Sequence, residues 1–374
     1  MDIGMWRLPG PTKFVQSVLQ DLRSGKSAVL LLPFHSPAGL RESVEELVRD
    51  NELWMWQVLD STAVRADNIG SLTMAIREKL RGPWTSAEKC SIEGLAEQIA
   101  GRVIWVNQVD EVAWPIWSKF LTRYQHACQS VAIADRGLFC VTRIGIAGSD
   151  PVTDVALSVR RWHGMVRRLD MTIYVDKVLT SRFTHPLHQK VALASIVEIS
   201  GSDPDLALHM ASQDLASILD PMNLLKEFAK RRNWTFDAVK NASWKDGMSD
   251  VVEGSQILHS AAVAMSEDRT ELSRRIWRAQ IGVIYPFIEE QRLRIIPQVR
   301  GYLHFPINMA FGIVNDAEDL EVGQLLYLLT GKPIRPRLRR LLVHLTAMRH
   351  ALAHLEPVPL PSLFADEVIQ PEAT

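Results

Sequence analysis

The sequence has few cysteines and no long apolar run, and both absences narrow the classes of protein it can belong to. The three cysteines, Cys90, Cys128 and Cys140, lie far apart and lack the spacing of metal ligands. This usage argues against a disulfide framework and a zinc site and is typical of a reducing compartment. No apolar run approaches the roughly 18 residues that a membrane span needs, and the first residues lack the apolar core of a secretion signal. We therefore expect a cytoplasmic protein without a membrane partner.

An excess of charge of either sign is also lacking. The chain has 42 lysines and arginines against 43 aspartates and glutamates, which gives a formal net charge of −1. No overall field therefore attracts nucleic acid, and any anion site must be a local patch. With 374 residues, 47% of them hydrophobic, the chain is long enough for two or three domains with buried cores.

The first 150 residues alternate between helix-like and strand-like segments. Three stretches have helical spacing, and the second is expected to start with Ser36 as N-cap and Pro37 at the first helical position. The expected helices are 11–25, 36–50 and 113–129, and the expected strands are 27–34, 54–60, 101–111, 129–135 and 137–145. Alternation at this spacing predicts a parallel α/β sheet covered on both faces, over residues 1–150.

Strand signals become rare after residue 152. The stretch 154–183 has a helical period, and from residue 205 onward the pattern is helical almost throughout. We expect a helical connector over 151–260 and an all-α bundle over 261–360. The Pro-rich, acidic residues 361–374 are expected to form a flexible tail.

The N-terminal part lacks the loop that binds phosphate in P-loop proteins. The triplet Gly25-Lys26-Ser27 precedes a strand, whereas a phosphate loop follows a strand and opens a helix. The turn after that strand, PFHSPAGL, has no lysine, and its prolines remove amides that a phosphate would need. The predicted sheet therefore has no Walker A loop, and it is the resemblance described next that implies a P-loop-like fold.

Two later segments, VIWVNQVDE and LFCVTRIG, resemble core strands of STAND-type and other AAA-like ATPases. The resemblance places Asn107 where these ATPases have a magnesium-binding carboxylate. It matches Asp110 and Glu111 to the acidic pair that follows, and Arg143 to the sensor arginine. It therefore implies a degenerate nucleotide site, and ATPase activity is not expected. The alternative is that Asp110 and Glu111 only cap the start of a helix.

The C-terminal part contains two Arg-x-x-x-x-His pairs, Arg339–His344 and Arg349–His354. On a helical wheel, five apolar residues fall within an arc of roughly 90° and form a packing seam: Leu341, Leu345, Met348, Leu352 and Leu355. Arg349, His350 and His354 fall on the opposite side, whereas His344 lies at the edge of the seam. The second pair is therefore the one predicted to face outward as a site.

The local charge around this pair is positive. Between Lys332 and His354 the sequence has no acidic residue, and it contains these arginines: Arg335, Arg337, Arg339, Arg340 and Arg349. Such a patch suits phosphate, and we expect Arg335, Arg337, Arg339 and Arg340 to bind nucleic acid. The alternative is that the arginines form salt bridges with the acidic stretch 316–321.

The segment MRHALAHLEP, which ends a long helix, resembles the signature of HEPN domains. Arg349 matches the arginine of that signature, His354 the histidine and His350 the variable polar position. The resemblance implies metal-independent RNA cleavage without a cofactor, by two copies paired through the C-terminal bundle, in an antiviral or toxin-like defence system. His354 would act as general base or acid on a ribose hydroxyl, Arg349 would hold the phosphate, and His350 would orient it or move a second proton.

A second hypothesis comes from the lost phosphate loop. A chain with a degenerate nucleotide fold and a helical bundle suits a non-catalytic scaffold or adaptor that binds other proteins of a multi-subunit defence complex. The sequence alone leaves both hypotheses open.

Overall fold

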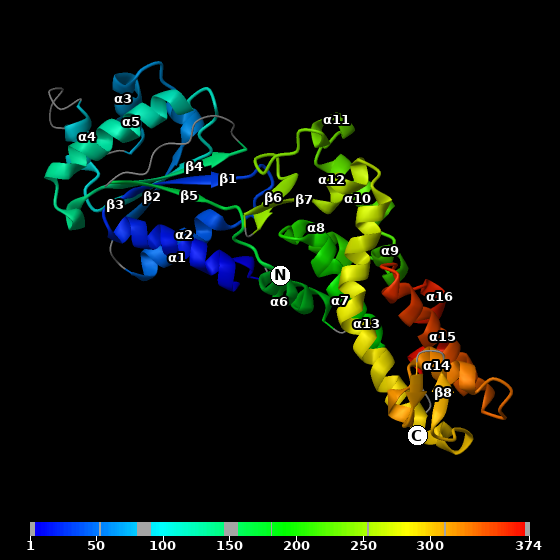
Figure 1. Cartoon of the computed structure of the whole chain (residues 1–374). Coiled ribbons are helices and arrows are strands. Elements are labelled where there is room, and N and C mark those ends of the chain that lie inside the picture. The colour runs from blue at the N-terminus through cyan, green and yellow to red at the C-terminus, as the bar shows by residue number, and fades with distance from the viewer. Residues whose placement is uncertain are drawn as a thin grey trace. The chain divides into compact units, whose positions relative to one another are not determined.

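The computed structural model describes residues 4–51, 54–80, 91–145, 156–180, 182–252, 254–309 and 312–370. Cys90 and the expected boundary at residue 150 lie outside these ranges. The chain divides into two compact units, each made of two stretches of sequence (Figure 1). Unit 1 comprises Met1–Asp170 and Asp237–His259, and unit 2 comprises Met171–Phe236 and Ser260–Thr374.

Unit 1 is built on a five-stranded sheet in which every pair of neighbours is parallel. The strand order is β2-β3-β4-β1-β5. The strands are β1 (Ser27–Leu32), β2 (Met55–Asp60), β3 (Arg102–Asn107), β4 (Leu138–Ile144) and β5 (Leu157–Arg161). The prediction of a parallel α/β sheet is confirmed. The central strand β1 is buried along its whole length, as expected for a sheet with both faces covered.

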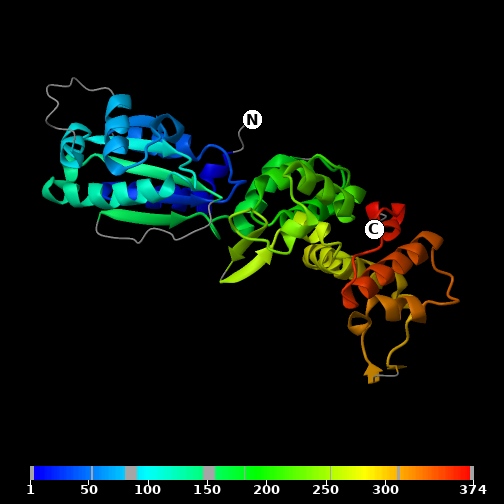
Figure 2. The same cartoon turned by 90° about the horizontal axis from the view of Figure 1, so that it is seen from above.

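Helices cover both faces of this sheet (Figures 1 and 2). Helices α1 (Pro9–Arg23) and α2 (Leu40–Asp50) lie on one face, and α3 (Ile69–Lys79), α4 (Ile92–Gln98) and α5 (Trp114–Ala127) lie on the other. Alternate strand residues such as Val29, Leu31, Ile104 and Val106 share one core with α3, α4 and α5. This alternation is the two-residue period of a strand.

Three local predictions in unit 1 are wrong. Helix α2 begins after Gly39, so neither Ser36 nor Pro37 starts it. The expected strand 129–135 instead forms short 3-10 turns, Cys128–Ser130 and Ile133–Asp135. Its apolar residues remain largely exposed there, so the segment buries too little surface to hold a place in the sheet.

The third error concerns the first part of residues 154–183, which were expected to be helical; the prediction is correct for Arg168–Leu179, which form a helix. Residues Leu157–Arg161 form strand β5, which pairs with β1. On this edge strand Arg160 forms an ion pair with Asp21 of α1, with 2.6 Å between Nε and Oδ2. A polar residue such as Arg160 hides the apolar alternation of this strand in the sequence. Its partner, Asp21, is distant in sequence, so local periodicity does not reveal the contact.

Residues 237–259 belong to unit 1, although they were expected to lie in a helical connector. They include the antiparallel hairpin of β6 (Ser249–Val252) and β7 (Ser255–Leu258). The backbone N–H of Phe34, just after β1, donates to the carbonyl of Lys245 at 3.0 Å. The amide of Gly164, after β5, donates to Asp250 Oδ1 at 3.0 Å. This segment therefore lies against the carboxyl ends of β1 and β5.

Unit 2 is almost entirely helical, but Ile307–Met309 and Gly312–Val314 form two short antiparallel strands, so the prediction of an all-α bundle over 261–360 is wrong there. Helices α6 (Arg168–Leu179) and α11 (Phe236–Val239) lie at its boundaries with unit 1. The helix α13 (Arg269–Val299) packs along α7 (Pro186–Ser200) and α15 (Pro336–Ala353) (Figure 1). The other elements are α8 (Pro204–Ala211), α9 (Leu215–Leu219), α10 (Met222–Arg231), α12 (Ser260–Met265), β8 (Ile307–Met309), β9 (Gly312–Val314), α14 (Val322–Leu328), α16 (Leu360–Leu363) and α17 (Asp366–Ile369).

The expected flexible tail is ordered as far as Gln370. Helices α16 and α17 pack against α15, and Leu363 and Val368 are fully buried. Burial of these two side chains offsets the entropy of ordering a short Pro-rich segment. The tail prediction is therefore wrong for residues 361–370, and residues 371–374 lie outside the described part. Among the helices that the structure describes, none has the length and apolar character that crossing a bilayer requires.

Candidate active site

Helix α15 presents the Arg349–His354 pair at its carboxyl end. Its apolar seam is buried as the wheel predicts, with Leu345, Met348 and Leu352 at most 3% exposed. His350 and His354 are exposed to solvent on the other side of the helix. The seam fixes the rotation of the helix, and this rotation turns both imidazoles outward.

The helix ends at the histidine itself. His354 is the C-cap residue, and Leu355 takes a left-handed conformation with φ 61°. The amide of Glu356 donates to the carbonyl of Ala351 at 2.9 Å, and the amide of Leu355 reaches the carbonyl of Leu352, which is a Schellman motif. Leu355 therefore leaves the seam and is 54% exposed, contrary to prediction. The last helical residue, Ala353, lies four residues before Pro357.

Helix α13 holds this end of α15 in place. Trp277 Nε1 donates to the carbonyl of Leu352 at 2.8 Å, one of the last carbonyls of the helix. Gln280 is fully buried, and its Oε1 accepts from the amide of Val358 at 2.7 Å. Sequence reasoning missed both residues. The only signal was a polar side chain and an indole within the helical pattern, which does not identify a distant partner.

The two histidines lie together. The ring centroids of His350 and His354 are 4.3 Å apart, with the rings inclined by 54°. Their spacing of four residues places them one turn apart on the same side of the helix. Imidazole exchanges protons near neutral pH, so the pair can supply one proton acceptor and one proton donor to the same bound molecule.

Arg349 contacts an acidic residue of another helix. Its guanidinium forms an ion pair with the carboxylate of Glu321, the N-cap residue of α14. The Arg349 side chain is only 27% exposed, against 51% for Glu321. Within the described part of the chain, neither imidazole hydrogen-bonds to Arg349. A phosphate that binds Arg349 must therefore displace Glu321 or share the guanidinium with it.

The four other arginines of the predicted nucleic-acid patch make intramolecular contacts. Arg339 donates to the carbonyls of Leu329 at 3.2 Å and Lys332 at 2.8 Å, just after α14 ends. Arg337 donates to the carbonyl of Gln370 at 2.7 Å. Arg339 thus binds the chain just after α14, and Arg337 binds it just after α17.

The remaining two arginines bind side chains. Arg340 forms an ion pair with Glu367 and thereby lowers the pKa of that carboxyl, and Arg335 donates to Gln298. The alternative of pairing with the acidic stretch 316–321 applies to Arg349, through Glu321, and to Arg300, which lies 3.8 Å from Asp316. Arg340 thus shares its charge with a carboxylate, whereas Arg337 and Arg339 bind neutral carbonyls, which leaves their positive charge in place.

The other Arg-x-x-x-x-His pair is not arranged in the same way. His344 is half-buried, and its Nδ1 lies 3.3 Å from Ser362 Oγ of α16. Arg339 points to the end of α14, as described above. The helical wheel therefore predicted the orientation of the two histidines, because His354 is exposed and His344 is half-buried, whereas Arg349 of the second pair is only partly exposed.

The four residues of the expected nucleotide site lie at or just after the carboxyl ends of the neighbouring strands β3 and β4, and three of them have described local contacts. Asn107 Oδ1 accepts from Trp105 Nε1 at 2.7 Å, and Asp110 Oδ1 accepts from the amide of Ala113 at 2.7 Å, just before α5. Glu111 is exposed, while Arg143 is 2% exposed with its guanidinium 4.0 Å from the centroid of the Trp114 ring. Asp110 thus caps the turn before α5, which is the alternative considered from the sequence.

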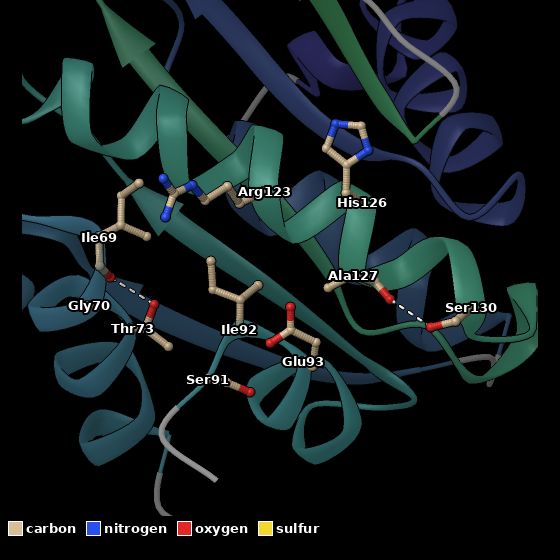
Figure 3. A pocket seen from close by; sticks show the side chains of 10 residues that line it. All are labelled: Ile69, Gly70, Thr73, Ser91, Ile92, Glu93, Arg123, His126, Ala127 and Ser130. Carbon is tan, nitrogen blue, oxygen red and sulfur yellow. Dashed lines mark hydrogen bonds between the residues drawn. The ribbon is translucent and has the colours of Figure 1, made fainter.

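A broad hollow of unit 1 lies over α3, α4 and α5 (Figure 3). Glu93, Arg123 and His126 line it, but His126 points away from Glu93 (Figure 3). Arg123 and His126 are both exposed, and their side chains do not converge on a common point. The hollow therefore has titratable groups without the mutual geometry of an acid–base site.

Across the described ranges no cluster of three or more histidine, cysteine, aspartate or glutamate side chains could hold a metal ion. Cys128 and Cys140 are both buried free thiols, and burial raises the pKa of each. Comparison of the chain with protein-family models and with curated protein sequences gave no match.

Proposed function

We propose that the chain is a metal-independent endoribonuclease of the HEPN type that acts in antiviral defence. The observation on which this rests is the exposed His350–His354 pair, with ring centroids 4.3 Å apart, on the helix that also positions Arg349. Unit 2, a mostly helical body around α13 and α15, supplies the scaffold. The long helix α13 fixes the end of α15 through Trp277 and Gln280.

The proposed reaction is an attack by a ribose 2′-oxygen on the adjacent phosphorus. One imidazole of the pair, assigned to His354, takes the proton of the 2′-hydroxyl while the new P–O bond forms. The P–O5′ bond breaks, and the second imidazole, assigned to His350, donates a proton to the leaving 5′-oxygen. The products are a 2′,3′-cyclic phosphate and a 5′-hydroxyl. Arg349 stabilises the charge that develops on the phosphate oxygens.

Two consequences follow for the active form. Arg349 has to exchange Glu321 for the phosphate, so RNA binding competes with an ion pair that is already present. The HEPN resemblance also implies that two copies pair through the helical bundle to form a composite cleft. The solvent exposure of His350, His354 and Leu355 supports such a pairing, because these side chains are available to a second copy.

Unit 1 is proposed to be a degenerate AAA-like or STAND-like domain that senses a signal or docks a partner. The strand order, with β1 between β4 and β5, supports this ancestry. Asn107 in place of a carboxylate and the capping role of Asp110 support a site that no longer hydrolyses ATP.

The test is a cleavage assay of purified full-length protein on RNA in the presence of EDTA. His354→Gln removes the proposed acid–base group and should lower the cleavage rate about 10²- to 10⁴-fold. His344→Gln is the matched control, because it alters a histidine of the same helix that contacts Ser362. Its rate should equal that of the wild type. Equal rates for all three proteins would refute the proposal.

The second candidate function is a non-catalytic adaptor of a defence complex. The contacts of the arginines favour this function. Arg349 and the four neighbouring arginines all bind groups of this same chain, and RNA would have to compete with these contacts. Expression in a cell separates the two functions. A nuclease should be toxic in a manner that depends on His354, whereas an adaptor should be harmless and should co-purify with a partner.

A further inference from the structure

The strand β2 forms an edge of the sheet in unit 1. Its inner side pairs with β3, and among the described strands none pairs with its outer side. The amide of Met55 donates to the carbonyl of Gly101 at 2.9 Å, so the backbone groups of Met55 point to the inner side. Successive residues of a strand point these groups to opposite sides, so the backbone groups of Trp56 and Val58 and the amide of Asp60 point outward. The outer side of β2 is therefore a row of open donors and acceptors.

This edge lacks the features that keep other edge strands from pairing. Natural proteins protect such edges with lysine, proline or a bulge. The sequence of β2, MWQVLD, contains neither lysine nor proline, and all of its residues pair with β3 in continuous register. Met55 is 68% exposed and Val58 is 42% exposed, so the edge also leaves apolar side chains in water. An added strand would cover both the open backbone groups and these side chains.

The charge pattern of β2 fits a second copy of β2 in antiparallel orientation. In such a pair, outward residues of one copy must lie opposite outward residues of the other. The two registers with the longest overlap then place Val58 opposite either Trp56 or Val58 of the second copy. Asp60, the single charged residue of the strand, lies opposite Trp54 or Trp56 of the second copy and not opposite the second Asp60. The repulsion that like charges cause in directly opposed positions is therefore absent.

We infer that β2 pairs antiparallel with β2 of a second copy, so that two five-stranded sheets continue into one. The backbone hydrogen bonds supply the attraction, and the uncharged run from Met55 to Leu59 removes the barrier that charges on an edge would impose. This contact lies in unit 1, whereas the pairing proposed for RNA cleavage lies in the bundle of unit 2. The inference does not rest on the proposed nuclease function, and its test has to observe β2 itself.

Hydrogen exchange of the full-length protein at low and high protein concentration, resolved by residue, tests the inference. The outward amides of Trp56 and Val58 should become protected as the concentration rises. The amides of Gln57 and Leu59, which point to β3, should be protected at both concentrations. A contact elsewhere in the molecule would not produce this alternation within one strand.

Two variants of one residue alter the proposed contact. Val58→Pro removes an outward amide from each copy, and an edge strand tolerates proline where its amide faces solvent. Val58→Lys places a charge on the edge. Each should raise the concentration at which Trp56 becomes protected about tenfold or more, because two backbone hydrogen bonds or their apolar surroundings are lost. Val112→Lys is the matched control, since Val112 is an 87% exposed valine of unit 1 outside the sheet, and it should behave as the wild type.

The outcomes are distinct. Protection of Trp56 that rises with concentration, or that is complete in the wild type and lost in both Val58 variants, supports the inference. Fast exchange of Trp56 and Val58 at every concentration would overturn it and would leave the edge to a different protein. Protection that both Val58 variants retain, or that Val112→Lys loses equally, would overturn it as well. His354→Gln should keep the protection, so failure of the nuclease and failure of this contact are separate results.

Discussion

At the scale of the residue, the ion pair between Arg349 and Glu321 is the contact that most affects the proposed chemistry. The Arg349 side chain is half-buried, and its carboxylate partner starts a different helix. An RNA phosphate offers the same charge and the same geometry of acceptors as a carboxylate. Glu321 is therefore a competitor for the substrate at the residue that is proposed to bind it.

Glu321→Gln should raise the affinity for RNA by a factor of about two to five, which is the range of an exposed ion pair. Glutamine keeps an oxygen that can cap α14 but loses the charge that competes with phosphate. Fluorescence anisotropy with a labelled RNA measures the change. Glu318→Gln, in the same acidic stretch, is the control. Unchanged affinity in Glu321→Gln would mean that Arg349 does not contact RNA phosphate.

The sequence predicted the orientation of His350, His354 and the buried seam, because helical periodicity depends only on spacing along the chain. It did not predict that Leu355 leaves the helix, since a left-handed leucine has no local signal. It did not predict Trp277 as a neighbour of the site, and it offered Glu321 only as part of the acidic stretch 316–321 that could pair with the arginines. These contacts join segments far apart in sequence, and only packing brings them together.

At the scale of the element, the carboxyl-terminal segment α16–α17 is a folded part of unit 2. His188 Nε2 lies 3.0 Å from the carbonyl of Leu363, and its ring meets Phe364 at 5.0 Å between centroids. His185 packs beside His188, with 5.2 Å between their rings. The two histidines thus support the segment that also binds Arg337 and Arg340.

Acidification should destabilise the segment α16–α17. Burial lowers the pKa of His185, and the charge of His188 acts in the same direction. At pH values between the lowered pKa of His185 in the folded protein and its ordinary pKa near 6.5, the unfolded state binds more protons than the folded state. The free energy of unfolding therefore falls as the pH drops below about 6.5.

Hydrogen exchange of residues 360–370 at pH 7.5 and 5.5, corrected for intrinsic rates, checks this expectation. Protection should be lower at pH 5.5 in the wild type, and the difference should shrink in His185→Gln, which cannot titrate. If the variant keeps the full pH dependence, His185 is not its source.

The errors of prediction at this scale have one cause. Strand β5 was missed because Ser158 and Arg160 interrupt the apolar pattern, and both bind Asp21 of α1. The segment 129–135 was predicted as a strand because its pattern is apolar, although it finds no neighbour to pair with in the sheet. Strands depend on partners distant in sequence, whereas helices such as α1, α5 and α15 satisfy their hydrogen bonds locally.

At the scale of the whole molecule, the chain passes between its two units three times, near residues 170, 236 and 259. The sequence predicted an α/β part followed by a helical part. It could not predict that residues 237–259 return to the first unit, because nothing local in a short hairpin identifies the sheet against which it packs.

Each unit has its own core, so damage to one should affect that unit first. Phe120 is fully buried among Trp117, Tyr124 and Phe139 in unit 1. Phe120→Ala should destabilise unit 1 by about 3–5 kcal/mol. Hydrogen exchange should show lost protection in β3 and β4 and unchanged protection in α13 and α15. Equal loss in α13 would show that the two units unfold together.

The central claim is that the histidines at the end of α15 transfer protons during attack by a ribose 2′-hydroxyl. The most direct test uses the wild-type protein in EDTA and two substrates of the same sequence. One is RNA, and the other lacks the 2′-hydroxyl at every position. The account predicts that the RNA is cut to 2′,3′-cyclic phosphate ends and that the 2′-deoxy substrate stays intact. Cleavage of both substrates, or of neither, would contradict it.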